Sequence, residues 1–299
     1  MKKQILLFYF ARISLSAYCS IDIADTTDVF KERLDRAFIE EVQNSQNKDK
    51  VLHAEPLFID LIRDLGARKG EKEWNVGMGI TDRNRYDVYN TLVEYEFAVI
   101  DRLGFEFELP FSFYYPTNTS KTQTSEEVQP GNKLNSIKLA SQWTFLVSEK
   151  KKTSMALGYI HEFELNDFKH YKKEIYHGNI YNPFMVIAKR WGNNYHTLLY
   201  HGPSIMQSFN NKTIRSSYQI NSNFHYMIPG TRNFIGLEFN KNFRSTDFDM
   251  TIRPQMRVGI ADNLMVGIVS GIPIKRENER FSSFIRLIYE PGHKHPKNM

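Results

Sequence analysis

The sequence predicts an all-β fold, an antiparallel up-and-down transmembrane β-barrel of about 12 strands with a short helical N-terminal extension. From Glu73 onward, apolar and polar residues alternate with a period of two, as in strands that show one face to lipid and the other to a lumen. Each alternating segment is close to the roughly 9–11 residues that a tilted strand needs to cross a bilayer. Tight and longer connections also alternate along the chain, as short periplasmic turns and longer external loops do in outer-membrane barrels.

The composition agrees with a barrel that exposes aromatic side chains to lipid. The chain of 299 residues contains 22 Phe, 16 Tyr and 3 Trp, which a membrane barrel uses on its lipid face and in two interfacial girdles. Its mean hydropathy is −0.47, and no run of about 18 apolar residues follows the N-terminus, so no transmembrane helix is expected in the mature chain. A soluble all-β fold is the alternative, but a sandwich with Greek-key links has no reason to alternate its connections in this way.

Residues 1–19 are predicted to be a signal peptide. Lys2 and Lys3 form a basic start, the apolar run 5–11 follows, and small residues come shortly before Cys19. The alternative is a buried N-terminal helix. Export would direct the chain to the Gram-negative outer membrane, and cleavage would remove Cys19, the single cysteine of the sequence.

Residues 20–72 are predicted to form a periplasmic helical extension or a plug. Apolar residues recur at helical spacing over 30–42, after a run of capping residues, which predicts a first helix. A second helix is expected between Pro56, which suits a first helical turn, and Gly66, which suits a C-cap. This second helix could plug the barrel, sit in its periplasmic mouth or lie on the membrane.

Potential metal ligands occur in the same extension. His53, Glu55 and Asp60 have suitable side chains, but their number and spacing match no metal template. Helix capping and surface charge explain them better, so the sequence predicts no metal site and no cofactor.

The barrel is expected to span residues 73–290. Its last strand is predicted within 280–289, and a disordered tail is expected at 291–299. Outer-membrane barrels usually end on an aromatic residue that the barrel assembly machinery reads, so the polar tail departs from that pattern.

The polar residues of the alternating segments are predicted to face the lumen and to line a path for solutes. If the strands around the tight turn 101–103 pair so that Glu96 lies opposite Glu108, two like charges meet. Such a pair destabilises a sheet unless it shares a proton, a cation or an arginine. Lining of a pore and structural filling of a narrow barrel explain the polar face equally well. The predicted lumen residues are Glu94, Glu96, Glu106, Glu108, Glu162, Glu164, Glu238, Arg253, Gln255 and Arg257.

An enzyme built into the barrel is a further alternative. A lipid hydrolase would need a serine nucleophile beside a histidine base, and His196 or His201 could act with Ser204 or Ser208. The residues around them match no hydrolase motif, and the sequence contains no GxSxG, GxxxxGK[ST], GxGxxG or HExxH pattern. We therefore predict no catalytic site. The net charge of +5 is spread without a basic stripe, which argues against a nucleic-acid partner.

Two stretches resemble known outer-membrane proteins. Residues 249–264 and 264–273 are similar to the late hairpins of transporter-like barrels grouped with the meta-pathway phenol-degradation family. The segment from His53 to Asp82 resembles a pre-barrel motif of uncharacterised bacterial outer-membrane proteins. The first resemblance covers only the C-terminal hairpins. It implies the barrel fold and the passage of small, often apolar or aromatic, molecules.

Together these features predict an outer-membrane barrel that passes small solutes passively through a polar lumen. Its expected partners are outer-membrane lipid, a small-molecule solute and the barrel assembly machinery. The alternative is a closed barrel with a structural, adhesive or partner-binding role, whose function would lie in the loops 116–134 and 166–181. The sequence leaves the substrate and the oligomeric state open.

Overall fold

The computed structural model describes residues 22–43, 49–59, 61–83, 85–117, 130–276 and 279–292. The predicted signal peptide (1–19) and residues 293–299 of the predicted tail lie outside the described residues.

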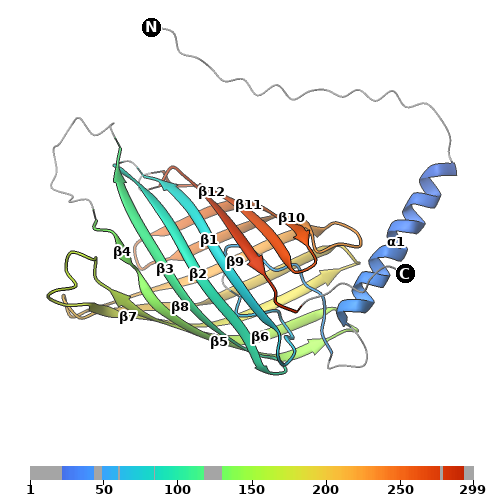
Figure 1. Ribbon diagram of the computed structural model, residues 1–299, viewed down its shortest axis with the longest axis horizontal. Coiled ribbons are helices and arrows are strands. Elements are labelled where there is room, and N and C mark those ends of the chain that lie inside the picture. The colour runs from blue at the N-terminus through green and yellow to red at the C-terminus, as the bar shows by residue number, and fades with distance from the viewer. Residues whose placement is uncertain are drawn as a thin grey trace, which may run out of the picture.

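One antiparallel sheet closes on itself to form the barrel of Figure 1. Each long strand pairs with the next one along the chain, and the last strand pairs with the first. The described chain contributes twelve long strands and the two-residue β4, so the predicted barrel of about 12 strands is confirmed. The strands are β1 (Lys72–Asp82), β2 (Tyr86–Ile100), β3 (Leu103–Pro116), β4 (Lys133–Leu134), β5 (Ser136–Ser148), β6 (Thr153–Leu165), β7 (Tyr176–Trp191), β8 (Tyr195–Ser208), β9 (Thr213–Met227), β10 (Phe234–Phe243), β11 (Phe248–Ala261), β12 (Leu264–Pro273) and β13 (Phe281–Tyr289).

The two faces of the wall differ as a membrane barrel requires. In β1, the side chains of Trp74, Val76 and Met78 are 45%, 50% and 64% exposed, while Asn75 between them is fully buried. Exposed apolar residues alternate with buried residues around the wall, and most of the buried residues are polar except on part of β5 to β8. An apolar outside and a polar inside is the reverse of a soluble barrel, and it suits contact with lipid chains.

Aromatic side chains gather near both ends of the strands. At one end, Trp74 lies against Tyr95 with ring centroids 4.5 Å apart, and it is also paired across the ladder with Tyr289. At the other end, Tyr89 and Tyr115 meet edge to face with centroids 5.2 Å apart. Two such groups correspond to the aromatic girdles that membrane barrels place at the two interfaces.

The two ends of the barrel differ in their connections. We call the end with the turns 101–102, 149–152, 192–194, 228–233 and 262–263 the turn end, and the opposite end the loop end. Because short turns lie on the periplasmic side of outer-membrane barrels, the turn end corresponds to that side.

The predicted pairing of Glu96 with Glu108 is wrong. Glu108 pairs with Glu94, and Glu106 pairs with Glu96, because a bulge between Ala98 and Ile100 shifts the register next to the turn.

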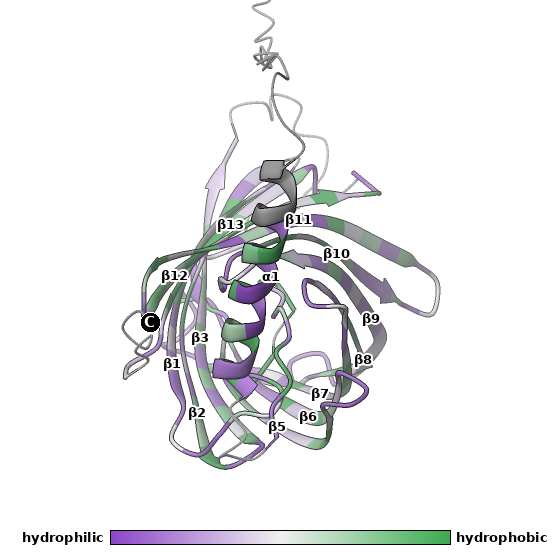
Figure 2. Ribbon diagram, turned by 90° about the vertical axis from the view of Figure 1, so that its right-hand side faces the viewer, coloured by the Kyte–Doolittle hydropathy of each residue, from purple (hydrophilic) through white to green (hydrophobic). Residues whose placement is uncertain are grey.

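The first predicted helix is confirmed as α1 (Asp22–Gln43). Figure 2 shows it in front of the barrel mouth at the turn end. Asp35 accepts hydrogen bonds from Gly230 N at 2.7 Å and from Asn194 Nδ2 at 2.9 Å, and both donors belong to turns of the wall. Phe38 packs with Met227 in an apolar cluster below the helix. No helix among the described residues is both long enough and apolar enough to cross a membrane.

The second predicted helix, between Pro56 and Gly66, is wrong. The described residues of 49–71 have no helix, and they run through the interior of the barrel as an irregular segment that we call the plug. A helix would satisfy its own backbone groups, whereas these groups are bonded to the barrel wall instead.

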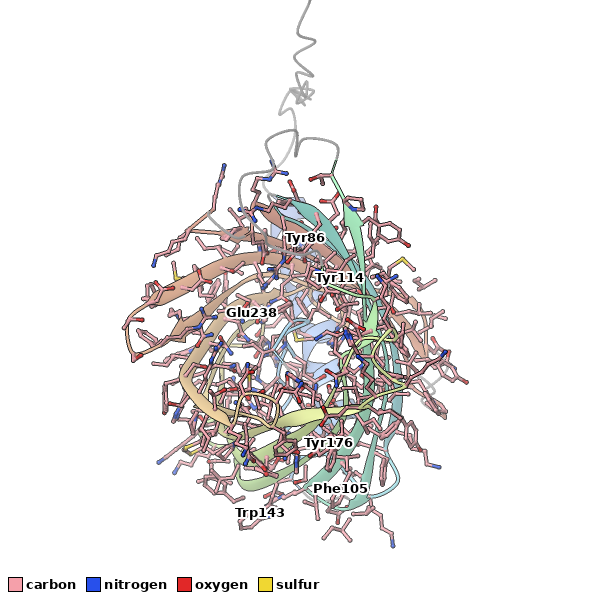
Figure 3. The ribbon with its side chains drawn as sticks, turned by 90° about the vertical axis from the view of Figure 1, so that its left-hand side faces the viewer. Tyr86, Phe105, Tyr114, Trp143, Tyr176 and Glu238 are labelled. Atoms are coloured by element: carbon pink, nitrogen blue, oxygen red, sulfur yellow. The ribbon has the colours of Figure 1, made fainter. Side chains whose placement is uncertain are left out.

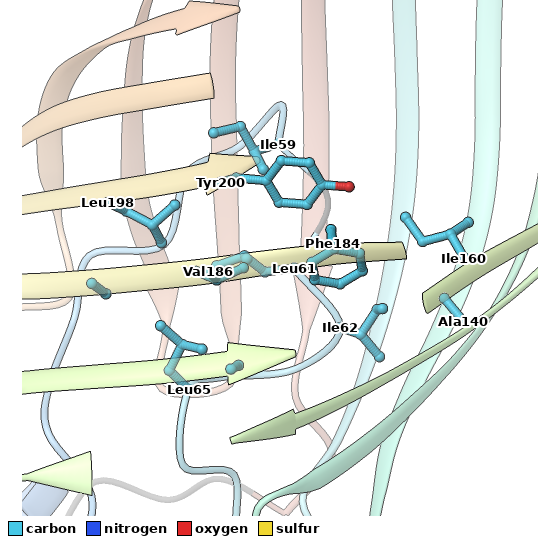
Figure 4. Close-up of a cluster of buried hydrophobic side chains, with 12 residues drawn as sticks. Ile59, Leu61, Ile62, Leu65, Ala140, Ile160, Phe184, Val186, Leu198 and Tyr200 are labelled. Atoms are coloured by element: carbon cyan, nitrogen blue, oxygen red, sulfur yellow. The ribbon is translucent and has the colours of Figure 1, made fainter. Parts of the chain in front are cut away.

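The plug brings apolar side chains into the lumen. Ile59, Leu61, Ile62 and Leu65 are buried against the inner face of β5 to β8 (Figure 4). On this side the wall is apolar, which the prediction of a polar lumen did not include. Its contribution consists of Ala140, Ala156, Ile160, Phe184, Val186, Ala188, Leu198 and Tyr200.

The lipid-facing surface can be tested with an introduced charge. Val93 is the midpoint of β2 and points outward, so Val93→Arg should lower the free energy of unfolding in a phospholipid bilayer by about 2–4 kcal/mol. Ile214→Arg, at the loop end of β9, is the matched control and should cost about 0–1 kcal/mol. Denaturant titration of the refolded protein in liposomes measures both, and equal costs would contradict a membrane-spanning wall.

Candidate functional site

The plug is held by hydrogen bonds between its backbone and side chains of the wall. An unpaired backbone group buried in a barrel costs about 1–3 kcal/mol, so an irregular segment there needs partners. Four plug N–H groups find acceptors on four different strands, β8, β11, β2 and β5. The bonds run from Ala54 N to His196 Nδ1 (3.0 Å), from Leu57 N to Gln255 Oε1 (2.7 Å), from Arg63 N to Glu96 Oε2 (2.7 Å) and from Gly66 N to Thr144 Oγ1 (3.1 Å).

Arg63 is the charged anchor of the plug. Its backbone adopts a positive φ of 63°, and its carbonyl oxygen accepts a hydrogen bond from Gln142 Nε2 at 3.1 Å. Its guanidinium donates to Glu73 Oε2 at 2.5 Å and lies 3.9 Å from Glu96 Oε2. The side chain is almost fully buried, so the arginine is a fixed positive charge beside Glu73 and Glu96.

The acidic wall consists of Glu94 and Glu96 on β2 and Glu106 and Glu108 on β3. All four are buried, and Asn75 Nδ2 donates to both Glu94 and Glu96. Oxygens of Glu94, Glu96 and Glu106 lie within 4.8 Å of one another, a spacing that could hold a cation.

Protein cations already neutralise this wall. Lys138 Nζ lies 3.2 Å from Glu106 and 2.5 Å from Glu108, and Arg286 lies 3.5 Å from Glu94. Each glutamate of the pairs across β2 and β3 therefore lies near a basic side chain, which makes such a pairing tolerable.

The basic residues on the opposite side of the lumen also contact the plug. The guanidinium of Arg253 lies over the ring of Phe58, 3.4 Å from its centroid. Arg257 is 3.7 Å from Glu55 of the plug. Glu238 is fully buried and accepts a hydrogen bond from Gln255 Nε2 at 2.9 Å.

Glu162 and Glu164 lie nearer the loop end and are only partly buried. Glu162 accepts a hydrogen bond from Ser136 Oγ at 2.8 Å.

All ten predicted lumen residues thus belong to the inner wall, but Glu96 and Gln255 hold the plug in place. Figure 3 looks into the loop end, with Glu238 toward the lumen and Trp143 on the outside.

Several residues of the site were not predicted. Asn75, Gln142, Thr144 and Arg286 are inward-facing residues that contact the plug or the acidic wall. The signal that could have found them is their place on the polar side of the same alternation. The plug anchor Arg63 has no comparable signal, because its segment has no period.

Cavities lie on both sides of the plug. Toward the loop end, a cavity of about 300 Å³ and a cavity of about 370 Å³ both reach Phe58. Toward the turn end, a chamber of about 480 Å³ extends to α1. We call the 300 Å³ cavity the outer vestibule and the chamber at the turn end the inner chamber.

A narrow cavity of about 30 Å³ lies between the two sides, and we call it the neck. It is lined by plug residues together with Glu96, Arg257 and Arg286 of the wall. A volume of this size holds about one or two water molecules. In this arrangement, the plug therefore leaves no room for a larger solute at the neck.

An ion pair closes the rim of the inner chamber. Arg232 of the turn 228–233 binds Glu290 in a bidentate manner, with 2.7 Å between Nη2 and Oε1. Burial alone raises the pKa of Glu290, but the hydrogen bond and the charge of Arg232 outweigh it and hold this pKa below the usual range. The carboxylate therefore stays ionised and ties the end of β13 to the turn after β9.

The residues considered for hydrolysis bind other partners. His196 Nδ1 accepts from Ala54 N, and His201 Nδ1 is 2.8 Å from Tyr218 Oη. Neither histidine is hydrogen-bonded to Ser204 or Ser208 in these contacts.

Comparison with known protein families gives one match. Residues 49–290 match the family model described as HAEPLYID-like, which covers both the plug and the barrel. No curated protein matches the chain.

Two solved structures show a similar barrel. One is an outer membrane channel from Pseudomonas putida F1, with a TM-score of 0.56 and 13% identity over 78% of this chain and 99% of that chain. The other is the NanC porin, with a TM-score of 0.51 and 8% identity over 72% of this chain and 97% of that chain. These likenesses show the fold of an outer-membrane β-barrel, in agreement with the apolar outer surface.

The anchoring of the plug can be tested by amide hydrogen exchange. Thr144→Val removes the acceptor of Gly66 N, which should speed exchange in plug peptides about fivefold, as expected for a lost hydrogen bond of about 1 kcal/mol. Thr197→Val is the matched control, because Thr197 bonds Trp191 on the outer face and not the plug. Plug amides that already exchange like those of an unfolded chain would contradict the described anchoring.

Proposed function

The chain belongs to the HAEPLYID-like family, and we propose that its barrel passes small solutes passively across the outer membrane when the plug moves aside. The observation that supports this proposal is the pair of cavities on either side of the plug, separated by a neck of about 30 Å³. A barrel interior filled only for stability would be closely packed, without chambers that reach the plug from both ends.

The way in which the plug is bound supports movement. Between residues 54 and 66, four of its N–H groups make single hydrogen bonds to side chains on four strands, each contributing about 0.5–1.5 kcal/mol. Its last residues, 67–71, are bonded to the backbone of β2 and of the turn 101–102. A strand inserted into the sheet would instead be held by a continuous ladder. The part of the plug between residues 54 and 66 can therefore shift without opening the wall, in the manner of a segment that changes between ordered positions.

Movement of the plug would change the charge of the path. Arg63 leaves with the plug, and Glu73 and Glu96 then lose a positive partner, while Arg257 loses Glu55. Lys138 and Arg286 remain on the wall beside the other glutamates. We therefore propose that the open lumen favours cations, because Glu94, Glu96, Glu106 and Glu108 then outnumber their basic partners.

The similar structures agree with passage. Their descriptions name an outer membrane channel and a porin. We propose that this protein likewise works without an enzymatic reaction, and that the barrel assembly machinery inserts it. A closed barrel with a structural or partner-binding role is the alternative that the following experiment decides.

The test is single-channel conductance in a planar bilayer. The full chain should open rarely, and the double variant T144V/Q255L, which lacks two of the four anchors, should open at least tenfold more often with the same unit conductance. The steps should prefer cations, and Glu106→Gln should weaken that preference.

Two matched variants serve as controls. Thr197→Val leaves the plug anchors intact and should behave like the full chain. Glu149→Gln lies in a turn outside the lumen and should leave the ion preference unchanged. Silence in the full chain, in T144V/Q255L and in a variant lacking residues 22–70, all shown to be folded, would contradict the channel.

A further inference from the structure

Five carboxamide side chains line the outer vestibule. Its lining includes Asn182 on β7, Gln219 and Asn221 on β9, and Asn240 and Asn242 on β10. Each carboxamide offers both donors and an acceptor, which is the chemistry that binds hydroxyl groups. The side chains come from three strands of the rigid wall, so their positions are fixed relative to one another.

Part of this hydrogen-bonding capacity is not used within the protein. Asn182 accepts from Tyr200 Oη, and Asn240 donates to Glu238 and accepts from Arg253, which holds these two amides in place. By contrast, Asn242 Oδ1 is enclosed and has no partner among the described residues. A buried polar atom of this kind calls for a ligand or a water molecule.

The floor of the vestibule presents an aromatic ring. Phe58 at the tip of the plug is 43% exposed, although it lies inside the barrel. The guanidinium of Arg253 covers one face of the ring at 3.4 Å from its centroid. Since the cavity also reaches Phe58, the rest of the ring is available to an apolar surface of a ligand.

The charge of the vestibule limits the ligand further. Lys138 in its lining is bound to Glu106 and Glu108. Lys241, Glu162 and Asp249 also line the cavity, so its two basic and two acidic side chains provide no excess of positive charge. An anionic ligand would meet these two carboxylates as well as Lys241, whose Nζ donates to Ser222 Oγ at 2.9 Å, so the site offers an anion no net attraction.

We infer that the outer vestibule is a binding site for a neutral polyhydroxylated solute, such as a monosaccharide or disaccharide. Hydroxyl groups would bond to the carboxamides, and the C–H face of a sugar ring would rest on Phe58. The volume of about 300 Å³ lies at the lower end of the range for small-molecule sites. The inference rests on the proposed function, for which this site would be the outer entrance of the path.

An apolar aromatic solute suits this site poorly. It would displace water from the carboxamides without replacing the hydrogen bonds, which costs binding energy at each group. The vestibule therefore differs from the passage of apolar molecules that the sequence resemblance implies.

The experiment is saturation-transfer NMR with the full chain folded in detergent micelles. The probes are maltose, the acidic disaccharide digalacturonate and phenol, each titrated to obtain a dissociation constant. Maltose should bind at least fivefold more tightly than either of the others. The double variant Q219A/N242A should weaken maltose binding about tenfold, and F58A should weaken it as well, because each removes contacts of the vestibule.

The control is Asn210→Ala, which removes an exposed carboxamide from the turn between β8 and β9 and should leave maltose binding unchanged. Tighter binding of digalacturonate or phenol, or maltose binding that all variants share, would overturn the inference. Binding is measured without passage, so its loss in a barrel that conducts would refute the site and leave the channel standing. Maltose binding by a barrel that never conducts would support the site and refute the channel.

Discussion

The structure depends on the pairing of plug backbone groups with side chains of the barrel wall. Within a barrel, an irregular segment has no water to satisfy all its N–H and C=O groups, so the wall must supply partners. His196, Gln255, Glu96 and Thr144 do so from four strands. Much of the polar inner face of the barrel therefore binds the plug. Only the part of this face that the plug leaves uncovered is available to solutes.

The same pairing sets the electrostatics of the lumen. The acidic wall on β2 and β3 is balanced partly by wall residues, Lys138 and Arg286, and partly by Arg63 of the plug. The position of the plug and the charge of the lumen are thus coupled, because Arg63 moves with the plug. The apolar contacts of Ile62 and Leu65 with β5 to β8 add a second, uncharged component to the seating of the plug.

The sequence predicted the barrel because the period of two is imposed on every strand by lipid outside and polar groups inside. It also predicted α1, whose apolar residues such as Phe38 recur at helical spacing. It failed for Pro56–Gly66, where local helix signals were overridden by hydrogen bonds to residues far along the chain. The register of Glu94 and Glu108 was missed because a single bulge, which leaves no mark in the periodicity, shifts the pairing.

Cysteine accessibility tests most directly whether the plug separates two compartments of the lumen. In a Cys19→Ser background, Phe58→Cys would place a thiol in the outer vestibule and Leu52→Cys one in the inner chamber. A membrane-impermeant maleimide added to intact cells should label position 58 and leave position 52 unlabelled until the outer membrane is permeabilised. Equal labelling of both positions in intact cells would contradict a plug that fills the barrel between them.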